Sequence, residues 1–210
     1  METFANYIKI AVSILVVVNP IGNSPIFLSV TEDQNEKQRN KTAFTTALAV
    51  AITLICSVFF GERILKLFGI DIPAFQVGAG ILILLMAISM LHAKVTGSKH
   101  TPEEAKEAEE KENVAIVPLA IPLMAGPGAM STVILCSNQS TQWEHKILLV
   151  LIVILISVFV WISLRMSTVI GKVIGKTGIN IATRLMGLIL AAIAVEFISK
   201  GLKVLLPGLS

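Results

Sequence analysis

Charged residues are scarce in this sequence: Asp, Glu, Lys and Arg make up only 15% of its 210 residues. Soluble domains carry roughly 25% of these residue types, whereas this chain is 54% hydrophobic. This balance excludes an ordinary soluble domain and predicts a polytopic membrane protein whose first partner is the lipid bilayer. Basic residues do not cluster with aromatic ones, so no nucleic-acid partner is expected.

The sequence is also poor in residues suited to covalent or metal chemistry. It has two cysteines, Cys56 and Cys136, both in or at the end of apolar runs, where a buried and inert thiol is expected. Its three histidines, His92, His100 and His145, do not have the spacing of a zinc site. We therefore expect no metal, no cofactor and no enzymatic activity, while coupling to protons or sodium stays open.

What the sequence does contain is long apolar runs, which predict six transmembrane helices because about 20 apolar residues cross the hydrocarbon core. The segment 61–68 alternates charged and apolar residues, which is typical of a short interfacial helix. The hydrophilic segment 93–112 predicts a cytoplasmic linker. The six runs cover approximately residues 7–30, 42–60, 73–91, 114–135, 147–164 and 183–206.

Helix-breaking residues interrupt the first and fourth runs. The first contains Asn19-Pro20-Ile21-Gly22-Asn23-Ser24-Pro25, and the fourth contains Gly126-Pro127-Gly128. Each proline removes a backbone donor and clashes with the preceding turn, and lipid cannot replace the lost partners. Non-helical backbone at membrane depth is tolerated where it is buried in protein or lines a water-filled cavity. The two breaks therefore predict a site at mid-membrane.

An internal repeat relates the two halves of the chain. Gly69-Ile70-Asp71-Ile72 recurs as Gly178-Ile179-Asn180-Ile181, and Pro20 has a counterpart in Pro127 at nearly the same spacing. An odd number of spans per half turns the second half upside down, as in many secondary transporters. The predicted fold is a single all-α membrane domain, 1–210, with two inverted three-helix repeats, 1–92 and 113–210. Its first and fourth helices are predicted to be broken at mid-membrane.

Three glycines inside the predicted spans, Gly78, Gly80 and Gly187, are interpreted as places of close helix packing rather than of substrate contact. Small residues let neighbouring helices approach each other closely in lipid. Gly78 and Gly80 are too near in sequence for a four-residue spacing, so no small-xxx-small motif is predicted.

The distribution of basic residues predicts the orientation. The loops that follow the odd-numbered runs carry most of the 17 Lys and Arg residues. Because cytoplasmic loops are enriched in these residues, both termini are predicted to be periplasmic. The same bias places the linker 93–112 in the cytoplasm.

Three separated motifs resemble those of the MarC family of bacterial inner-membrane proteins. They are the first break with Ile26 and Phe27, the segment 118–128 around the second break, and the segment 178–187. The resemblance covers essentially the whole chain. It implies a multi-pass protein of the bacterial inner membrane with six helices, related to transporters of neutral amino acids.

The two breaks contain the candidate substrate-binding residues. A broken helix exposes amides at one half-helix N-terminus, which favours a carboxylate, and carbonyls at the other half-helix C-terminus, which favours an ammonium group. Neither break contains a charged side chain, which suits a neutral solute. The alternative is that proline and glycine only kink packed helices while asparagine satisfies the freed backbone. The candidates are Asn19, Pro20, Gly22, Asn23, Ser24, Gly126, Pro127, Gly128, Ser131 and Thr132.

Two charged residues in the sixth run are candidates for further roles. A carboxylate at the depth of Glu196 is costly unless it is paired, protonated or facing water. Glu196 is therefore a candidate for proton coupling, and the alternative is an ion pair with Lys200 one turn later. Arg184 is a candidate gate, and the alternative is that it extends to the lipid headgroups.

Together these features predict a secondary transporter of small neutral solutes, with neutral amino acids favoured, that works by alternating access around the two broken helices. The alternative is a non-transporting assembly or regulatory protein that acts through its cytoplasmic loop. The sequence leaves the oligomeric state open, and a homo-oligomer is compatible with it.

Overall fold

The computed structural model describes residues 2–31, 34–91, 124–140 and 142–209, and within these ranges all regular structure is helical. The predicted all-α class is therefore confirmed for the described chain. The helices are α1 (Glu2–Val18), α2 (Ser24–Val30), α3 (Glu36–Leu67), α4 (Ile72–Leu91), α6 (Pro127–Ser137), α7 (Trp143–Arg165) and α8 (Ser167–Leu205), followed by the 3-10 turn η2 (Pro207–Leu209).

Four helical segments are long and apolar enough to cross a membrane: α3, α4, α7 and the Asn180–Leu205 part of α8. The segments Phe4–Val18 and Pro127–Ser137 are apolar but shorter, and they belong to the two runs that contain the breaks. The chain is thus a polytopic helical membrane protein that is embedded in a lipid bilayer. Residues 92–123 lie outside the described part, so the six-helix inverted repeat stays a prediction.

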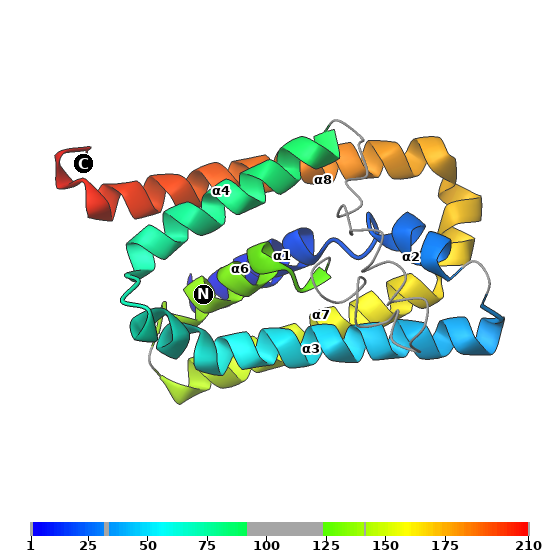
Figure 1. Ribbon diagram of the computed structural model, residues 1–210, viewed down its shortest axis with the longest axis horizontal. Helices are drawn as coiled ribbons and strands as arrows, with labels where there is room; N and C mark the ends of the chain where they lie inside the picture. The colour runs from blue at the N-terminus through cyan, green and yellow to red at the C-terminus, as the bar shows by residue number, and fades with distance from the viewer. Residues whose placement is uncertain (1, 32–33, 92–123, 141, 210) are drawn as a thin grey trace.

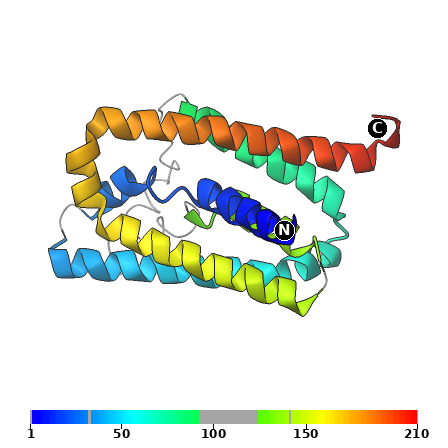
Figure 2. The same cartoon turned by 180° about the vertical axis from the view of Figure 1, so that it is seen from behind.

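The helices form three layers, seen in Figure 1 and from behind in Figure 2. Helix α3 packs against α7 in one outer layer, and α4 packs against α8 in the other. The members of each pair run in opposite directions, as the colours show. Helices α1, α2 and α6 lie between the two layers, with α1 and α6 in contact. The two interrupted runs therefore form the centre of the molecule.

Helix α3 is longer than the sequence pattern predicts. The separate interfacial helix expected at 61–68 is wrong, because α3 continues without interruption to Leu67. A capping box at Asn35 starts the helix, since its side chain accepts a hydrogen bond from the Gln38 amide while the Gln38 side chain accepts one from the Asn35 amide. Gly61 lies inside α3, and because it has no side chain, Ile134 of α6 can pack directly on it.

Close approach of α4 and α8 depends on small residues. A Cβ atom at Gly80 would lie 2.6 Å from the Ile198 side chain, and one at Gly187 would lie 3.1 Å from the Ala87 carbonyl oxygen. The predicted packing role is therefore confirmed for both glycines. For Gly78 it is wrong, because nothing lies within 4 Å of the corresponding Cβ position.

Two glycines have a backbone φ in the left-handed region. Gly69 has φ +65° in the turn before α4, and Gly175 has φ +66° at a kink near the start of α8. This conformation is readily adopted only by glycine. The segment Gly178–Ile181, which repeats the Gly69 motif in sequence, lies inside α8 beyond this kink. The predicted linker 93–112 falls outside the described residues.

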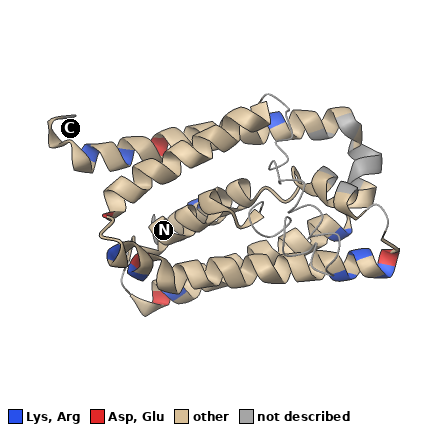
Figure 3. Ribbon diagram, viewed as in Figure 1, with Lys and Arg blue, Asp and Glu red and all other residues tan. Residues whose placement is uncertain are grey.

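Charged side chains gather mostly toward the two ends of the long axis, as Figure 3 shows. Both termini lie toward the same end as the turn between α3 and α4. The first turns of α3, which include Arg39 and Lys41, and the end of α7 at Arg165 lie at the opposite end. This separation indicates that the long axis is close to the membrane normal, while the side on which the termini lie remains a prediction.

Candidate functional site

The first break is a tight, hydrogen-bonded turn between α1 and α2. Asn19 is buried, and with φ 48° it is the only non-glycine residue of the described chain that has a left-handed backbone. Its Oδ1 accepts a hydrogen bond from the Gly22 amide at 3.2 Å, and its Nδ2 lies 3.9 Å from the sulfur of Met90. Asparagine tolerates this backbone conformation because its short polar side chain bonds locally. The turn is therefore built around the side chain of Asn19.

Two further polar side chains of this break satisfy backbone carbonyls. Asn23 donates from Nδ2 to the carbonyl of Val18 at 3.1 Å, and Ser24 donates from Oγ to the carbonyl of Pro20 at 3.1 Å. Both residues and Pro20 are buried. These bonds replace partners that the helix loses at its interruption. The side chains thus stabilise the break in the conformation described.

The second break places the start of α6 beside the end of α1. Gly126 is the N-cap residue of α6, and Pro127 occupies its first turn, where no amide is needed. A Cβ atom at Gly128 would lie 3.4 Å from Val17 of α1 and 3.4 Å from Ile83 of α4. Because α1 and α6 run in opposite directions (Figure 1), the carbonyl end of one half-helix lies near the amide end of the other.

A cavity of about 170 Å³ lies at this junction. Its volume is below the roughly 300–1,000 Å³ of pockets for drug-sized ligands, so it suits a small solute. Three predicted site residues, Gly126, Pro127 and Gly128, line it, and no described lining residue is charged. The complete lining is Val17, Leu82, Met86, Met124, Gly126, Pro127, Gly128 and Ala129.

The other predicted residues of α6 are engaged within the helix. The Ser131 hydroxyl bonds to the Pro127 carbonyl, and the Thr132 hydroxyl donates to the Gly128 carbonyl at 2.8 Å. Ser131 also lines a second, mostly apolar groove of about 720 Å³ between α3, α4 and α6. The groove shares Leu82 and Pro127 with the small cavity. Of the predicted site residues, only the segment 126–128 lines the small cavity, and the predicted residues of the first break do not line it.

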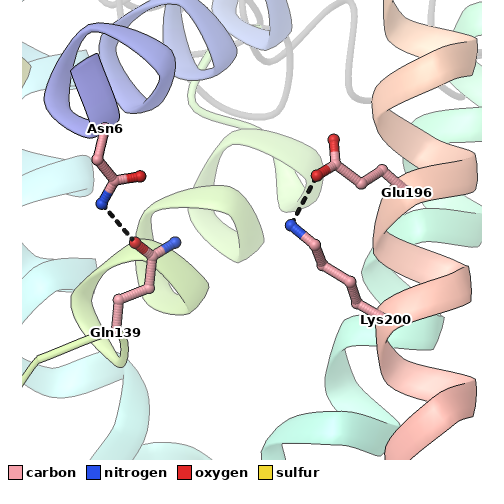
Figure 4. A network of polar contacts seen from close by, with 4 residues as sticks. All are labelled: Asn6, Gln139, Glu196 and Lys200. Atoms are coloured by element: carbon pink, nitrogen blue, oxygen red, sulfur yellow. Dashed lines mark hydrogen bonds and ion pairs between the residues drawn. The ribbon is translucent and has the colours of Figure 1, made fainter. Parts of the chain in front are cut away.

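The charged candidates of α8 lie away from the breaks. Glu196 and Lys200 form an ion pair at 2.6 Å, with side chains 59% and 62% exposed, so the pairing considered as the alternative role is present. In Figure 4 this pair extends from α8 toward α1 and α6, where Asn6 donates to Gln139. Arg184 is exposed on α8. The structure brings neither candidate into the lining of the cavity.

A buried polar cluster that the sequence does not reveal joins α1, α6 and α7. His145 is buried, and its Nε2 lies 2.8 Å from the carbonyl oxygen of Cys136. A carbonyl can only accept, so Nε2 carries the proton, and in the neutral ring Nδ1 accepts from the Tyr7 hydroxyl at 2.8 Å. Tyr7 and His145 are 138 positions apart, which is why no local pattern could predict the pair.

Loss of this cluster should destabilise the protein. His145→Ala removes the buried bond to the Cys136 carbonyl and leaves the Tyr7 hydroxyl without its partner, so we expect a loss of roughly 1–3 kcal/mol in the free energy of unfolding. Tyr7→Phe should cost about 1 kcal/mol, because only one bond is lost. Thermal unfolding in detergent measures both effects. Glu144→Gln, at an exposed position of the same helical turn, is the control, and equal melting temperatures for all variants would contradict the assignment.

The described residues contain no group of three or more His, Cys, Asp and Glu side chains that could hold a metal ion. The groups present at the two breaks are backbone amides and carbonyls at helix ends, glycine residues, and the side chains of Asn, Ser and Thr.

Comparison with known proteins gives consistent matches. A family model described as MarC family integral membrane protein matches residues 4–206. A UPF0056 membrane protein of Buchnera aphidicola (from Acyrthosiphon pisum) is 40% identical over 97% of this chain and 94% of its own length. The UPF0056 membrane protein YhcE of Escherichia coli is 40% identical over 98% of this chain and 96% of its own length. A UPF0056 membrane protein of Methanocaldococcus jannaschii is 36% identical over 91% of this chain and 93% of its own length. No solved structure matches the chain.

Proposed function

The chain belongs to the MarC family of integral membrane proteins, and on this basis we propose that it is a secondary transporter of small neutral solutes, with neutral amino acids as the favoured class. The observation that carries the proposal is the junction of α1 and α6. There the C-terminal end of one half-helix and the N-terminal end of another meet at a small cavity that residues of α1, α4 and α6 line.

The chemistry of this junction fits a zwitterion. A helix N-terminus has a partial positive charge of roughly half an elementary charge, which favours a carboxylate, and a helix C-terminus has the opposite charge, which favours an ammonium group. The glycines at 126 and 128 let a ligand approach the α6 backbone closely, because they have no side chain in the way. The uncharged lining disfavours a solute with a net charge.

The arrangement of the outer layers supports alternating access. The pairs α3–α7 and α4–α8 lie on opposite sides of the central helices, and the left-handed Gly69 and Gly175 lie before α4 and at the kink inside α8. These features favour two inverted repeats, 1–92 and 113–210, that move relative to each other around the breaks. In this proposal the protein lies in the bacterial inner membrane with periplasmic termini, and Glu196 could take part in proton coupling only when its pairing with Lys200 is released.

The test is uptake of labelled glycine, alanine and serine into proteoliposomes with and without a proton gradient. Wild type should show saturable uptake of at least one solute. Asn19→Ala should reduce uptake roughly tenfold, since a left-handed alanine costs about 1–2 kcal/mol and the bond to the Gly22 amide is lost. Asn19→Gly is the matched variant, because it keeps the backbone conformation and removes only the side chain.

Retained uptake in Asn19→Gly would mean that the backbone conformation of the turn is sufficient, and lost uptake would mean that the side chain, which accepts the bond from the Gly22 amide, is also required. Absence of uptake of all three solutes by folded wild-type protein would contradict the proposed function.

Deletion of residues 97–110 should leave uptake unchanged, and an effect of that deletion would favour a regulatory role for the cytoplasmic loop.

A further inference from the structure

A second polar site lies at the end of the molecule opposite the termini, where Arg39 connects three helices. Arg39 lies in the first turn of α3 and is partly buried. Its Nη2 donates to the carbonyl of Thr31, just beyond the end of α2, at 3.0 Å. Its Nη1 donates to the hydroxyl of Thr168 in the first turn of α8 at 3.3 Å. The guanidinium group is thus held in place by two neutral acceptors.

Two polar atoms of this site have no hydrogen-bond partner among the residues that the structure describes. The Nε of Arg39 is buried and has no hydrogen-bond partner, and the same is true of the Oγ of Ser167. Ser167 is completely buried, and it directly precedes Thr168, which contacts Arg39. The ion pairs among the described residues do not involve Arg39. A buried donor without an acceptor is costly, so these two atoms favour a bound acceptor.

The surroundings favour an anion. Ser167 is the first residue of α8, and the preceding Met166 offers no side-chain cap to the helix N-terminus, where anions are favoured. The start of α3, which contains Lys41, and the end of α7 at Arg165 lie at the same end of the molecule. Arginine binds phosphate through a planar set of donors, which makes it well suited to this role.

We propose that Arg39 and Ser167 bind a phosphate oxyanion, from either an anionic phospholipid headgroup or free phosphate. The Nε of Arg39 would supply the charged donor and the Ser167 hydroxyl the neutral one. Because Arg39 already contacts the residue after α2 and the start of α8, a bound phosphate would strengthen the connection between the two halves of the chain. The site is separate from the cavity at the breaks and does not depend on the transport proposal.

The test uses the purified full-length chain in a neutral detergent. The probes are phosphatidylglycerol, phosphatidylcholine and inorganic phosphate, with bound lipid counted by native mass spectrometry and the melting temperature followed in parallel. Arg39→Gln and Ser167→Ala should each weaken phosphate-group binding roughly tenfold, the effect of losing a hydrogen bond in a charged pair. Lys37→Gln removes an exposed charge from the same turn of α3 and is the control.

Stabilisation by phosphatidylglycerol alone identifies a lipid headgroup as the source, and stabilisation by inorganic phosphate as well identifies a site for free phosphate. Equal binding of phosphatidylcholine would show that the zwitterionic headgroup also supplies the oxyanion. Binding that neither Arg39→Gln nor Ser167→Ala weakens, or that Lys37→Gln weakens equally, would overturn the proposal. Ser167→Ala keeps the test decisive if loss of the Arg39 contacts impairs folding.

Discussion

Gly128→Leu should abolish solute uptake while leaving the protein folded in the membrane. Gly128 lines the cavity at the start of α6, and its Cβ position already lies 3.4 Å from Val17 and Ile83. The additional carbons of leucine must therefore occupy the cavity of about 170 Å³, which would then have no room for a solute. Uptake into proteoliposomes measures the effect, with reconstituted protein quantified in each sample.

Gly128→Ala is the matched control for this experiment. Its single methyl group would lie at ordinary contact distance from Val17 and Ile83, so most of the cavity stays open. We expect substantial uptake by Gly128→Ala and none by Gly128→Leu. Full uptake by the leucine variant would place the substrate elsewhere, whereas loss in both variants would show that the α6 backbone itself must remain accessible.

Gly80→Ala should cause the largest loss of stability among single methyl additions to α4. Its Cβ atom would lie 2.6 Å from the Ile198 side chain and 2.9 Å from the Ala194 carbonyl oxygen. The second contact is with backbone, so α4 and α8 must move apart. Overpacking of this kind costs typically about 1–3 kcal/mol, which should appear as a lower melting temperature in detergent.

Gly78→Ala is the control, two residues away on the same helix. Nothing lies within 4 Å of that Cβ position, and alanine is a better helix former than glycine by about 1 kcal/mol. Its melting temperature should therefore stay equal to that of wild type or rise. If both alanine variants melt at the same temperature, the close contact of α4 and α8 does not determine stability.

These expectations follow from how helices associate in lipid. Lipid chains are as apolar as leucine, so packing and close backbone approach hold membrane helices together. The α4–α8 contact uses Gly80, Gly187 and Gly201, whose Cβ positions all lie within 3.1 Å of a backbone oxygen of the facing helix. The stability of the outer layer thus depends on residues with almost no side chain.

Four of the six predicted spans and the positions of the two breaks were predictable from the sequence, because both depend on local properties. Mean hydropathy over about 20 residues decides whether a helix can cross the membrane, and proline and glycine interrupt a helix wherever they occur. The turn at Asn19–Asn23 and the start of α6 after Gly126 are where those residues predict them. The family was also predictable, since its three motifs are linear.

The errors and omissions concern features that are not local. The segment 61–68 was expected to be separate, but Ile134 of another helix packs on Gly61 and α3 continues. Gly78 and Gly80 are equivalent in the sequence pattern, yet only Gly80 faces α8. The bonds from Arg39 to Thr168 and between Tyr7 and His145 join residues more than 100 positions apart.

By itself the sequence determined a helical membrane protein of the MarC family with polar, helix-breaking residues inside two apolar runs. Only the tertiary structure decided that the end of α1 meets the start of α6 at a small cavity, and that Asn19, Asn23 and Ser24 bond to backbone within their own turn. The physical reason is that hydropathy and backbone preference act over a few residues, whereas a cavity and its lining depend on the packing of distant helices.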